Sequence, residues 1–302
     1  MKNNNLVNLF IVGAAKCGTT SLYEYLAQHP QIYMCPVKEP HFFSNKVENS
    51  NKSLYERPAK GKKYHTKIIK DRAVYDSLFD EGEGLKIRGE ASPTYLWDPE
   101  SALKIFNYNS HAKIIVILRN PVDRLISSYQ MNYSLGLQSN TNDFLDTIKN
   151  EYKKEKKIWG YDGIYLDLGL YNEQISRYSA LFPSQQLLIL KFDDLIKNTS
   201  ETIKRVLNFL DVDQKYLEVI DLKKVHNETL TIKYPLIKKL RKVKIISKLG
   251  HSLSSKFGFL KKMTHSKGYS SDLVIDENAR AFLNDFYHND LVKLKENFKI
   301  EF

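Results

Sequence analysis

The chain has little cysteine and no long apolar run, and these two absences exclude several classes of protein. Cys17 and Cys35 are the only cysteines among 302 residues, so no disulfide framework and no cysteine-rich zinc site is expected. No stretch reaches the roughly 18 consecutive apolar residues that a membrane-spanning helix needs. The first residues are polar and do not resemble a signal peptide, so we expect a cytoplasmic protein. We also expect that the protein needs no metal.

Acidic residues are absent from one long segment. Between Glu228 and Asp272 there are eleven lysines and arginines and no acidic residue. These eleven positive charges equal the net charge of +11 of the whole chain. Apolar residues recur there at steps of three or four, so residues 230–268 are predicted to form an interrupted amphipathic helix. Three interpretations remain open for residues 233–267: a helix packed on the core, a surface for an anionic polymer, or peripheral contact with the inner face of a membrane. No nucleic-acid motif accompanies the charge, so nucleic acid is not an expected partner.

The N-terminal residues 8–21 (NLFIVGAAKCGTTS) have the pattern of a strand, a glycine turn and the start of a helix. A helix that begins near Thr19 directs its free N–H groups and its positive dipole end at an anion. The loop differs from the triphosphate-binding G-x-x-x-x-G-K-[ST], because Thr19 stands where that motif has lysine, which favours a shorter nucleotide. Cys17 is expected to fill the loop rather than to react. The candidate phosphate-binding residues are Lys16, Cys17, Gly18, Thr19, Thr20 and Ser21.

A second phosphate motif follows a predicted buried strand at residues 113–118 (KIIVIL). Pro121 can begin a helix, which leaves Arg119 at the strand end to make charge-assisted hydrogen bonds to a phosphate. Ser127 lies two helical turns further on and can donate its hydroxyl. Arg124 either contributes to this site or serves as a structural ion-pair partner.

These two segments resemble the nucleotide motifs of sulfotransferases that use 3′-phosphoadenosine-5′-phosphosulfate (PAPS). Residues 16–22 resemble the 5′-phosphosulfate loop, and residues 119–129 (RNPVDRLISSY) are similar to the 3′-phosphate motif R-[ND]-P-x-x-R-x-x-S-x-[YW]. The resemblance implies that Arg119 and Ser127 select the 3′-phosphate, which ATP lacks. Residues 264–269 resemble the late Lys-Gly loop of the family, which implies that Lys267 and Gly268 also contact the nucleotide.

The residues between these motifs resemble the heparan-sulfate branch of the family. Residues 36–43 (PVKEPHFF) match its K-E-x-x-F-F segment, which implies that Glu39 is the general base that takes the acceptor proton. His41 is the rival base, because histidine has that role in the branch that acts on small phenols and steroids. Residues 88–96 resemble the acceptor-bordering G-E-x-[ST]-P-x-Y-[LF] segment, although Ala91 stands where many members have lysine. Glu90 is interpreted as a structural carboxylate.

Four predicted strands set the expected fold. They lie near residues 8–12, 85–89, 113–118 and 187–191 and are separated by helical stretches, which predicts one α/β domain over residues 1–302. The domain should have three layers, with a P-loop-like central parallel sheet between helices. Its ligand site is expected at the carboxyl ends of the strands, where Lys16, Glu39 and Arg119 would converge.

The resemblance implies a transferase that moves the sulfuryl group of PAPS to a hydroxyl or amine of a carbohydrate or glycan and releases 3′,5′-adenosine bisphosphate. In this scheme displacement is in line and Lys16 stabilises the leaving phosphate. Two alternatives remain: an ATP- and Mg²⁺-dependent small-molecule kinase, and a non-catalytic protein that binds a polyanion. The polar residues 45–63 are read either as a lid over the acceptor or as an insertion without a role.

Overall fold

A five-stranded parallel sheet forms the centre of the computed structural model, which describes residues 6–47, 68–134, 144–160, 162–222, 230–232, 265–267 and 275–302. The strand order is β2-β3-β1-β4-β5, and each pair is parallel. The strands are β1 (Leu9–Gly13), β2 (Ile32–Met34), β3 (Ile87–Ala91), β4 (Lys113–Leu118) and β5 (Leu187–Lys191). The chain builds β2 and β3 on one side of β1 and then crosses to add β4 and β5 on the other. Ligands bind at such a switch in strand order.

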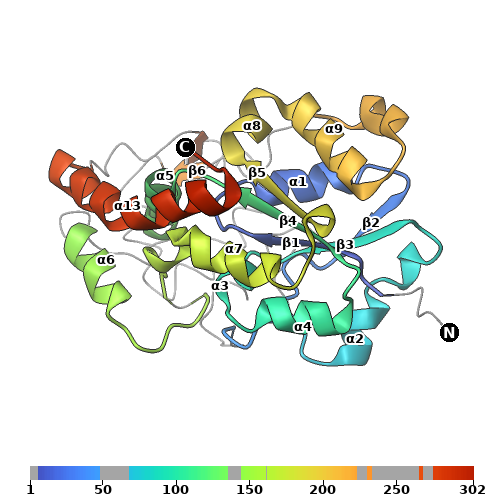
Figure 1. The fold of residues 1–302 in the computed structure, drawn as a ribbon, viewed down its shortest axis with the longest axis horizontal. Coiled ribbons are helices and arrows are strands. Elements are labelled where there is room, and N and C mark those ends of the chain that lie inside the picture. The colour runs from blue at the N-terminus through green and yellow to red at the C-terminus, as the bar shows by residue number, and fades with distance from the viewer. Residues whose placement is uncertain are drawn as a thin grey trace.

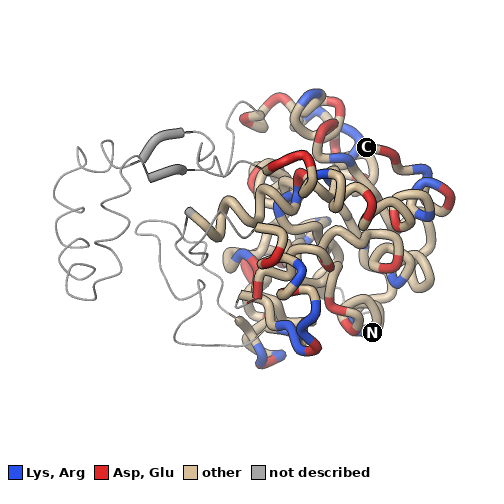
Figure 2. The backbone as a smooth tube through the Cα atoms, turned by 90° about the vertical axis from the view of Figure 1, so that its left-hand side faces the viewer, with Lys and Arg blue, Asp and Glu red and all other residues tan. Residues whose placement is uncertain are grey.

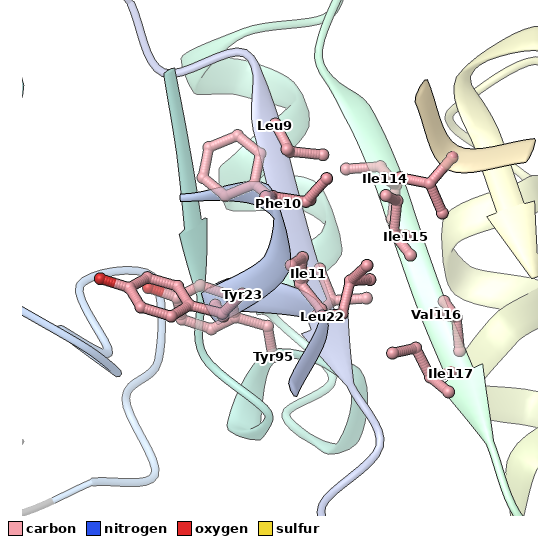
Figure 3. Packing of buried hydrophobic residues seen from close by; sticks show 14 of the residues in the cluster. Leu9, Phe10, Ile11, Leu22, Tyr23, Tyr95, Ile114, Ile115, Val116 and Ile117 are labelled. Atoms are coloured by element: carbon pink, nitrogen blue, oxygen red, sulfur yellow. The ribbon is translucent and has the colours of Figure 1, made fainter. Parts of the chain in front are cut away.

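Helices cover both faces of the sheet, which confirms the predicted three layers (Figure 1). One face carries α1 (Thr19–Leu26), α8 (Phe192–Lys197) and α9 (Thr199–Leu210), and the other carries α3 (Thr94–Trp97), α4 (Ser101–Tyr108) and α7 (Tyr171–Ser179). A short helix, α2 (Arg72–Ser77), precedes β3. Because both faces are covered, β1 and β4 are continuous apolar strands, and Figure 3 shows their side chains packed together.

Three more helices lie together to one side of the sheet, beyond the ends of its strands: α5 (Pro121–Ser134), α6 (Phe144–Tyr152) and α13 (Glu277–Phe298) (Figure 1). They share a second apolar cluster, which includes Leu125, Tyr129, Phe144, Leu283 and Tyr287. The sequence analysis did not predict α13. The second cluster extends the domain on the side where β4 leads into α5.

The segment between α9 and α13 falls largely outside the described residues. Between residues 222 and 275, its described parts are β6 (Leu230–Ile232) and β7 (His265–Lys267), which pair antiparallel. The amphipathic helix predicted over residues 230–268 therefore stays a prediction. Both interpretations of residues 45–63, a lid or an insertion without a role, also stay open, because most of these residues lie outside the described part. In the described part, basic and acidic residues are interspersed along the chain (Figure 2). No helix of that part is long and apolar enough to cross a membrane.

Candidate active site

The loop between β1 and α1 is shaped to receive an anion. Gly18 has φ of +90° and precedes the first residue of α1, and a Cβ there would lie 3.1 Å from the side chains of Leu195 and Phe192. Both the left-handed backbone and the close packing therefore require glycine. No side chain caps the start of α1, so its first-turn N–H groups and its positive dipole end face the loop. A helix terminus of this kind binds phosphate or sulfate groups.

The polar side chains of the loop have different exposures. Cys17 is fully buried, with its sulfur 3.6 Å from the carbonyl oxygen of Ala15, and burial raises its thiol pKa to about 11. The thiol thus fills the loop, as expected, and its side chain does not face a ligand. Thr19 is also buried, whereas Thr20 and Ser21 are partly exposed. Of the three hydroxyls, only these two are on partly exposed residues.

Lys16 is the cation of the loop and extends toward α5. Its Nζ lies 3.4 Å from the sulfur of Met131. Burial lowers the pKa of Lys16, the nearby Arg119 lowers it further, and the negative charge of Glu39 opposes this effect. Lys16 therefore shares one electrostatic environment with the predicted 3′-phosphate residue and the predicted base, as the sequence analysis expected.

Arg119 is held at the carboxyl end of β4 by contacts with two other segments. Its guanidinium carbon lies 4.8 Å from the ring centroid of Phe192, the first residue of α8. Its carbonyl accepts a hydrogen bond of 2.9 Å from the hydroxyl of Tyr171, which also lies 4.0 Å from the sulfur of Cys17. The Tyr171 hydroxyl therefore connects the two phosphate motifs. Ser127 is partly exposed on α5.

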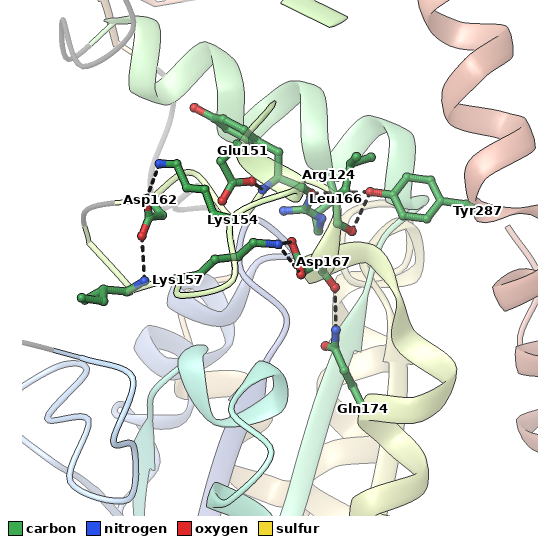
Figure 4. A network of polar contacts seen from close by, with 11 residues as sticks. Arg124, Glu151, Lys154, Lys157, Asp162, Leu166, Asp167, Gln174 and Tyr287 are labelled. Atoms are coloured by element: carbon green, nitrogen blue, oxygen red, sulfur yellow. Dashed lines mark hydrogen bonds and ion pairs between the residues drawn. The ribbon is translucent and has the colours of Figure 1, made fainter. Parts of the chain in front are cut away.

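Arg124 lies in the protein interior, where its hydrogen-bond acceptor is a backbone carbonyl and not an acidic side chain. The side chain is fully buried and donates to the carbonyl of Tyr165. Within the described residues it makes no ion pair, so its partner there is a backbone carbonyl. Figure 4 shows the guanidinium beside the loop that Tyr287 of α13 also holds, through a 3.0 Å hydrogen bond to the carbonyl of Leu166. Arg124 thus helps to fix the loop that follows α6.

The residues that follow β2 make a tight turn that presents Glu39 and His41. Both have positive φ, +59° and +53°. The His41 ring is buried, with Nδ1 2.8 Å from Thr94 Oγ1 and Nε2 3.7 Å from Glu39 Oε2. The other carboxylate oxygen, Glu39 Oε1, lies 2.5 Å from Nζ of Lys38. The Glu39 side chain is 19% exposed, so a substrate hydroxyl can reach it.

The pKa values of the two candidate bases are shifted by different causes. Burial lowers the pKa of His41 to about 4, so the ring is neutral at neutral pH. Burial acts to raise the pKa of Glu39, but the charges of Lys38, of a protonated His41 and of Lys16 outweigh it, and the pKa is lowered. Because His41 is neutral near pH 7, the two lysines are what keep the carboxylate ionised there. Glu39 is therefore an ionised and partly exposed proton acceptor, whereas the His41 side chain has no exposed surface.

Glu90 is connected to this turn through hydrogen bonds, in the structural role that was expected. Its buried carboxyl accepts hydrogen bonds from Tyr75 (2.7 Å), Tyr95 (2.9 Å) and Ser92 (2.7 Å). The Ser92 hydroxyl in turn accepts the backbone N–H of His41 at 3.2 Å. Burial raises the pKa of Glu90 to about 7 in spite of these donors. Its neighbour Ala91 is buried in β3 and contributes no charge.

Two tryptophans lie next to the turn, and sequence reasoning missed them. The ring centroids of Trp97 and Trp159 are 6.4 Å apart, and that of Trp159 is 6.2 Å from the His41 ring. Trp97 and Ala15 of the phosphate loop are partly buried against the cluster to which Trp159 belongs. No motif marks either residue, because only the tertiary fold brings them to the site.

The remaining predicted ligands lie at the limit of the described residues. Lys267 is the last residue of β7, of which only the backbone is described, and Gly268 lies outside the described residues. Where the structure describes the chain, no group of three or more His, Cys, Asp or Glu side chains could hold a metal ion.

Comparisons with known proteins all indicate the same family. The family model for the sulfotransferase domain matches residues 7–248. Human carbohydrate sulfotransferase 15 is 26% identical over 68% of this chain and 44% of its own length, and human heparan sulfate glucosamine 3-O-sulfotransferase 3B1 is 26% identical over 69% and 47%. The chain spans less than half the length of these curated relatives. A solved sulfotransferase from Alicyclobacillus acidocaldarius has a TM-score of 0.69 and 26% identity over 98% of this chain and 97% of that one.

Proposed function

Because the chain belongs to the sulfotransferase domain family, we propose that it transfers the sulfuryl group of PAPS to a hydroxyl or amine of a carbohydrate or glycan. One observation supports this most directly. The phosphate loop, the Glu39 turn and Arg119 come from separate segments, yet Lys16 is electrostatically coupled to both Glu39 and Arg119. A phosphate-binding loop, a second phosphate-binding cation and an ionised base in one place are what a nucleotide-dependent transfer to a hydroxyl needs.

The charges of this site fit the donor. Lys38 and Lys16 both act on the carboxylate of Glu39, and Arg119 lies close enough to act on Lys16. The start of α1 adds positive potential for the 5′-phosphosulfate, and Arg119 with Ser127 would hold the 3′-phosphate. The ring of Phe192, 4.8 Å from the guanidinium carbon of Arg119, helps to hold this cation, whose N–H groups would bind the phosphate.

The proposed reaction is an in-line displacement at sulfur. Glu39 accepts the proton of the acceptor hydroxyl as its oxygen bonds to sulfur, and the bond from sulfur to the 5′-phosphate oxygen breaks. Lys16 and the N–H groups at the start of α1 stabilise the negative charge that grows on the leaving phosphate. The products are a sulfate ester and 3′,5′-adenosine bisphosphate, with the proton on Glu39.

A sugar acceptor is supported by the aromatic rings beside the base. Trp159 lies beside His41, and Trp97, which lies beside Trp159, remains partly exposed. The apolar faces of sugar rings pack well on tryptophan, and such rings commonly line ligand sites. The two relatives described above are named for carbohydrate and heparan sulfate sulfotransfer, which agrees with this choice.

Replacement of the base tests the proposal. The assay measures 3′,5′-adenosine bisphosphate released from PAPS in the presence of a panel of glycans. Glu39→Gln should lower kcat by about 10²- to 10⁴-fold, because general-base catalysis contributes that much, while affinity for the bisphosphate is kept. Glu173→Gln, which changes an exposed carboxylate on α7, is the matched control and should be fully active. Near-normal turnover of Glu39→Gln would rule out Glu39 as the base, and phosphoryl transfer from ATP and Mg²⁺ would indicate a kinase instead.

A further inference from the structure

Lys38 lies against the proposed base, and the mechanism above gives it no individual role. Its Nζ is 2.5 Å from Glu39 Oε1, the shortest ion pair among the described residues. Only 12% of the Lys38 side chain and 19% of the Glu39 side chain are exposed. Surface ion pairs are weak because water screens them, whereas a pair as enclosed as this one retains much of its attraction.

The backbone is shaped to make this pair. Neighbouring residues on an extended chain point in opposite directions, so adjacent side chains seldom meet. Here Glu39 has φ of +59°, a conformation that non-glycine residues adopt at a cost of about 1–3 kcal/mol and keep only where the surroundings hold it. Two contacts hold the turn: the N–H of Ile69 donates to the carbonyl of Pro40 at 3.0 Å, and the N–H of His41 donates to Ser92.

Glu39 is paired directly with Lys38 and not with Lys16. Three titratable groups act on the carboxylate: Lys38, His41 and Lys16. Lys16 is close enough for Glu39 to influence its pKa, yet the two make no ion pair within 4 Å, while Lys38 occupies Glu39 Oε1. Without the Lys38 ammonium, Lys16 would be the remaining cation for the carboxylate to approach. A direct pair between Glu39 and Lys16 would neutralise the charge that the leaving phosphate requires.

We propose that Lys38 is a positioning residue for the transfer reaction, which fixes Glu39 through Oε1, leaves Oε2 for the acceptor hydroxyl and keeps the base apart from Lys16. This inference rests on the proposed function, since it assigns how the base of that reaction is held. At residue 91 of β3, the strand beside β2, the chain has a buried alanine and therefore no charge.

Three variants test this role. Lys38→Met removes the charge and keeps the length of the side chain, Lys38→Arg restores the charge, and Lys46→Met changes an exposed lysine in the same segment. The readouts are kcat, the KM values for PAPS and acceptor, and the pH profile of kcat/KM. Lys38→Met should lower kcat by about 10- to 100-fold with little change in the KM for PAPS, because the base is less well oriented.

The pH profile separates positioning from a purely structural role. An opposite charge within about 4–6 Å lowers a carboxyl pKa by about 1–3 pH units. Removing Lys38 should therefore raise the pKa of Glu39 and move the acidic limb of the profile upward by about one pH unit or more. Lys38→Arg should restore both kcat and the acidic limb, and Lys46→Met should match the wild type.

Three results would overturn the inference. If the wild type turns over PAPS and Lys38→Met has the same kcat and the same acidic limb, Lys38 has no role in positioning the base. If Lys38→Met is faster than the wild type, the pair restrains the base instead of preparing it. If the wild type fails to turn over PAPS with any glycan, the proposed function itself fails, and the role of Lys38 fails with it.

Discussion

The buried carboxyl of Glu90 should make the folded protein less stable as the pH rises toward and past neutrality. Its pKa is about 7 in the folded protein, against an ordinary value of 4.5 that applies when the chain is unfolded. Between these values the folded state binds more protons than the unfolded state, so the free energy of unfolding falls with increasing pH. The stabilisation is complete below about pH 4.5 and is lost as the pH rises through about 7.

The size of this effect follows from the pKa difference. Each pH unit is worth about 1.4 kcal/mol, so a difference of about 2.5 units amounts to about 3 kcal/mol. That is a substantial part of the 5–15 kcal/mol by which a domain is typically stable. The physical cause is the burial of Glu90 beneath the turn, where three hydroxyl donors compensate only in part for lost hydration.

Urea unfolding, followed by tryptophan fluorescence at pH 5 and pH 8, measures this quantity. Other groups also titrate in this range, so the wild type is compared with Glu90→Gln, and only the difference between the two is interpreted. The advantage of the wild type over the variant should shrink by about 2–3 kcal/mol between pH 5 and pH 8. A difference that stays constant over this range would refute the reasoning, because it would mean that the carboxyl is ionised throughout.

Two further substitutions probe contacts that only the structure revealed. Tyr171→Phe removes the hydroxyl that joins Arg119 to the phosphate loop and should cost about 1–3 kcal/mol of stability, since the partly buried carbonyl of Arg119 loses this donor; unchanged urea unfolding would exclude this role. Trp97→Ala should raise the KM for the glycan acceptor by about tenfold, as expected for the loss of an aromatic stacking surface, and leave the KM for PAPS unchanged. Equal effects on both KM values would instead indicate a general disturbance of the site.

The central strands and both phosphate motifs could be predicted because their signals are local. The predicted strands 113–118 and 187–191 match β4 and β5 in both bounds, and the other two lie within two residues of β1 and β3. These strands are continuous apolar runs, since helices cover both faces of the sheet. The predicted start of α1 at Thr19 and of α5 at Pro121 is also confirmed, because glycine and proline mark those positions.

Elements without such signals were not predicted. The β2 strand has only three residues, which is too short for a period to show. The α13 helix mixes charges of both signs around much of its surface, so no wide apolar stripe identifies it.

The finer organisation of the site depends on tertiary contacts. Trp97 and Trp159 are far apart in sequence and meet only because the loop after α6 packs near the turn that carries His41. The pair between Lys38 and Glu39 depends on the left-handed backbone of Glu39, which no residue preference would have indicated. Asp211 adopts a left-handed conformation at the end of α9, with φ of +56°, at a position where glycine is the usual residue of helices.

Calorimetric binding of 3′,5′-adenosine bisphosphate, compared with 5′-AMP and with ATP plus Mg²⁺, tests the central claim most directly. The account predicts micromolar binding of the bisphosphate, weaker binding of 5′-AMP, and a loss of about tenfold or more in Arg119→Ala for the bisphosphate alone, because charge-assisted hydrogen bonds are worth about 1.5–3 kcal/mol. A preference for ATP with Mg²⁺, or equal affinity for 5′-AMP and the bisphosphate, would contradict it.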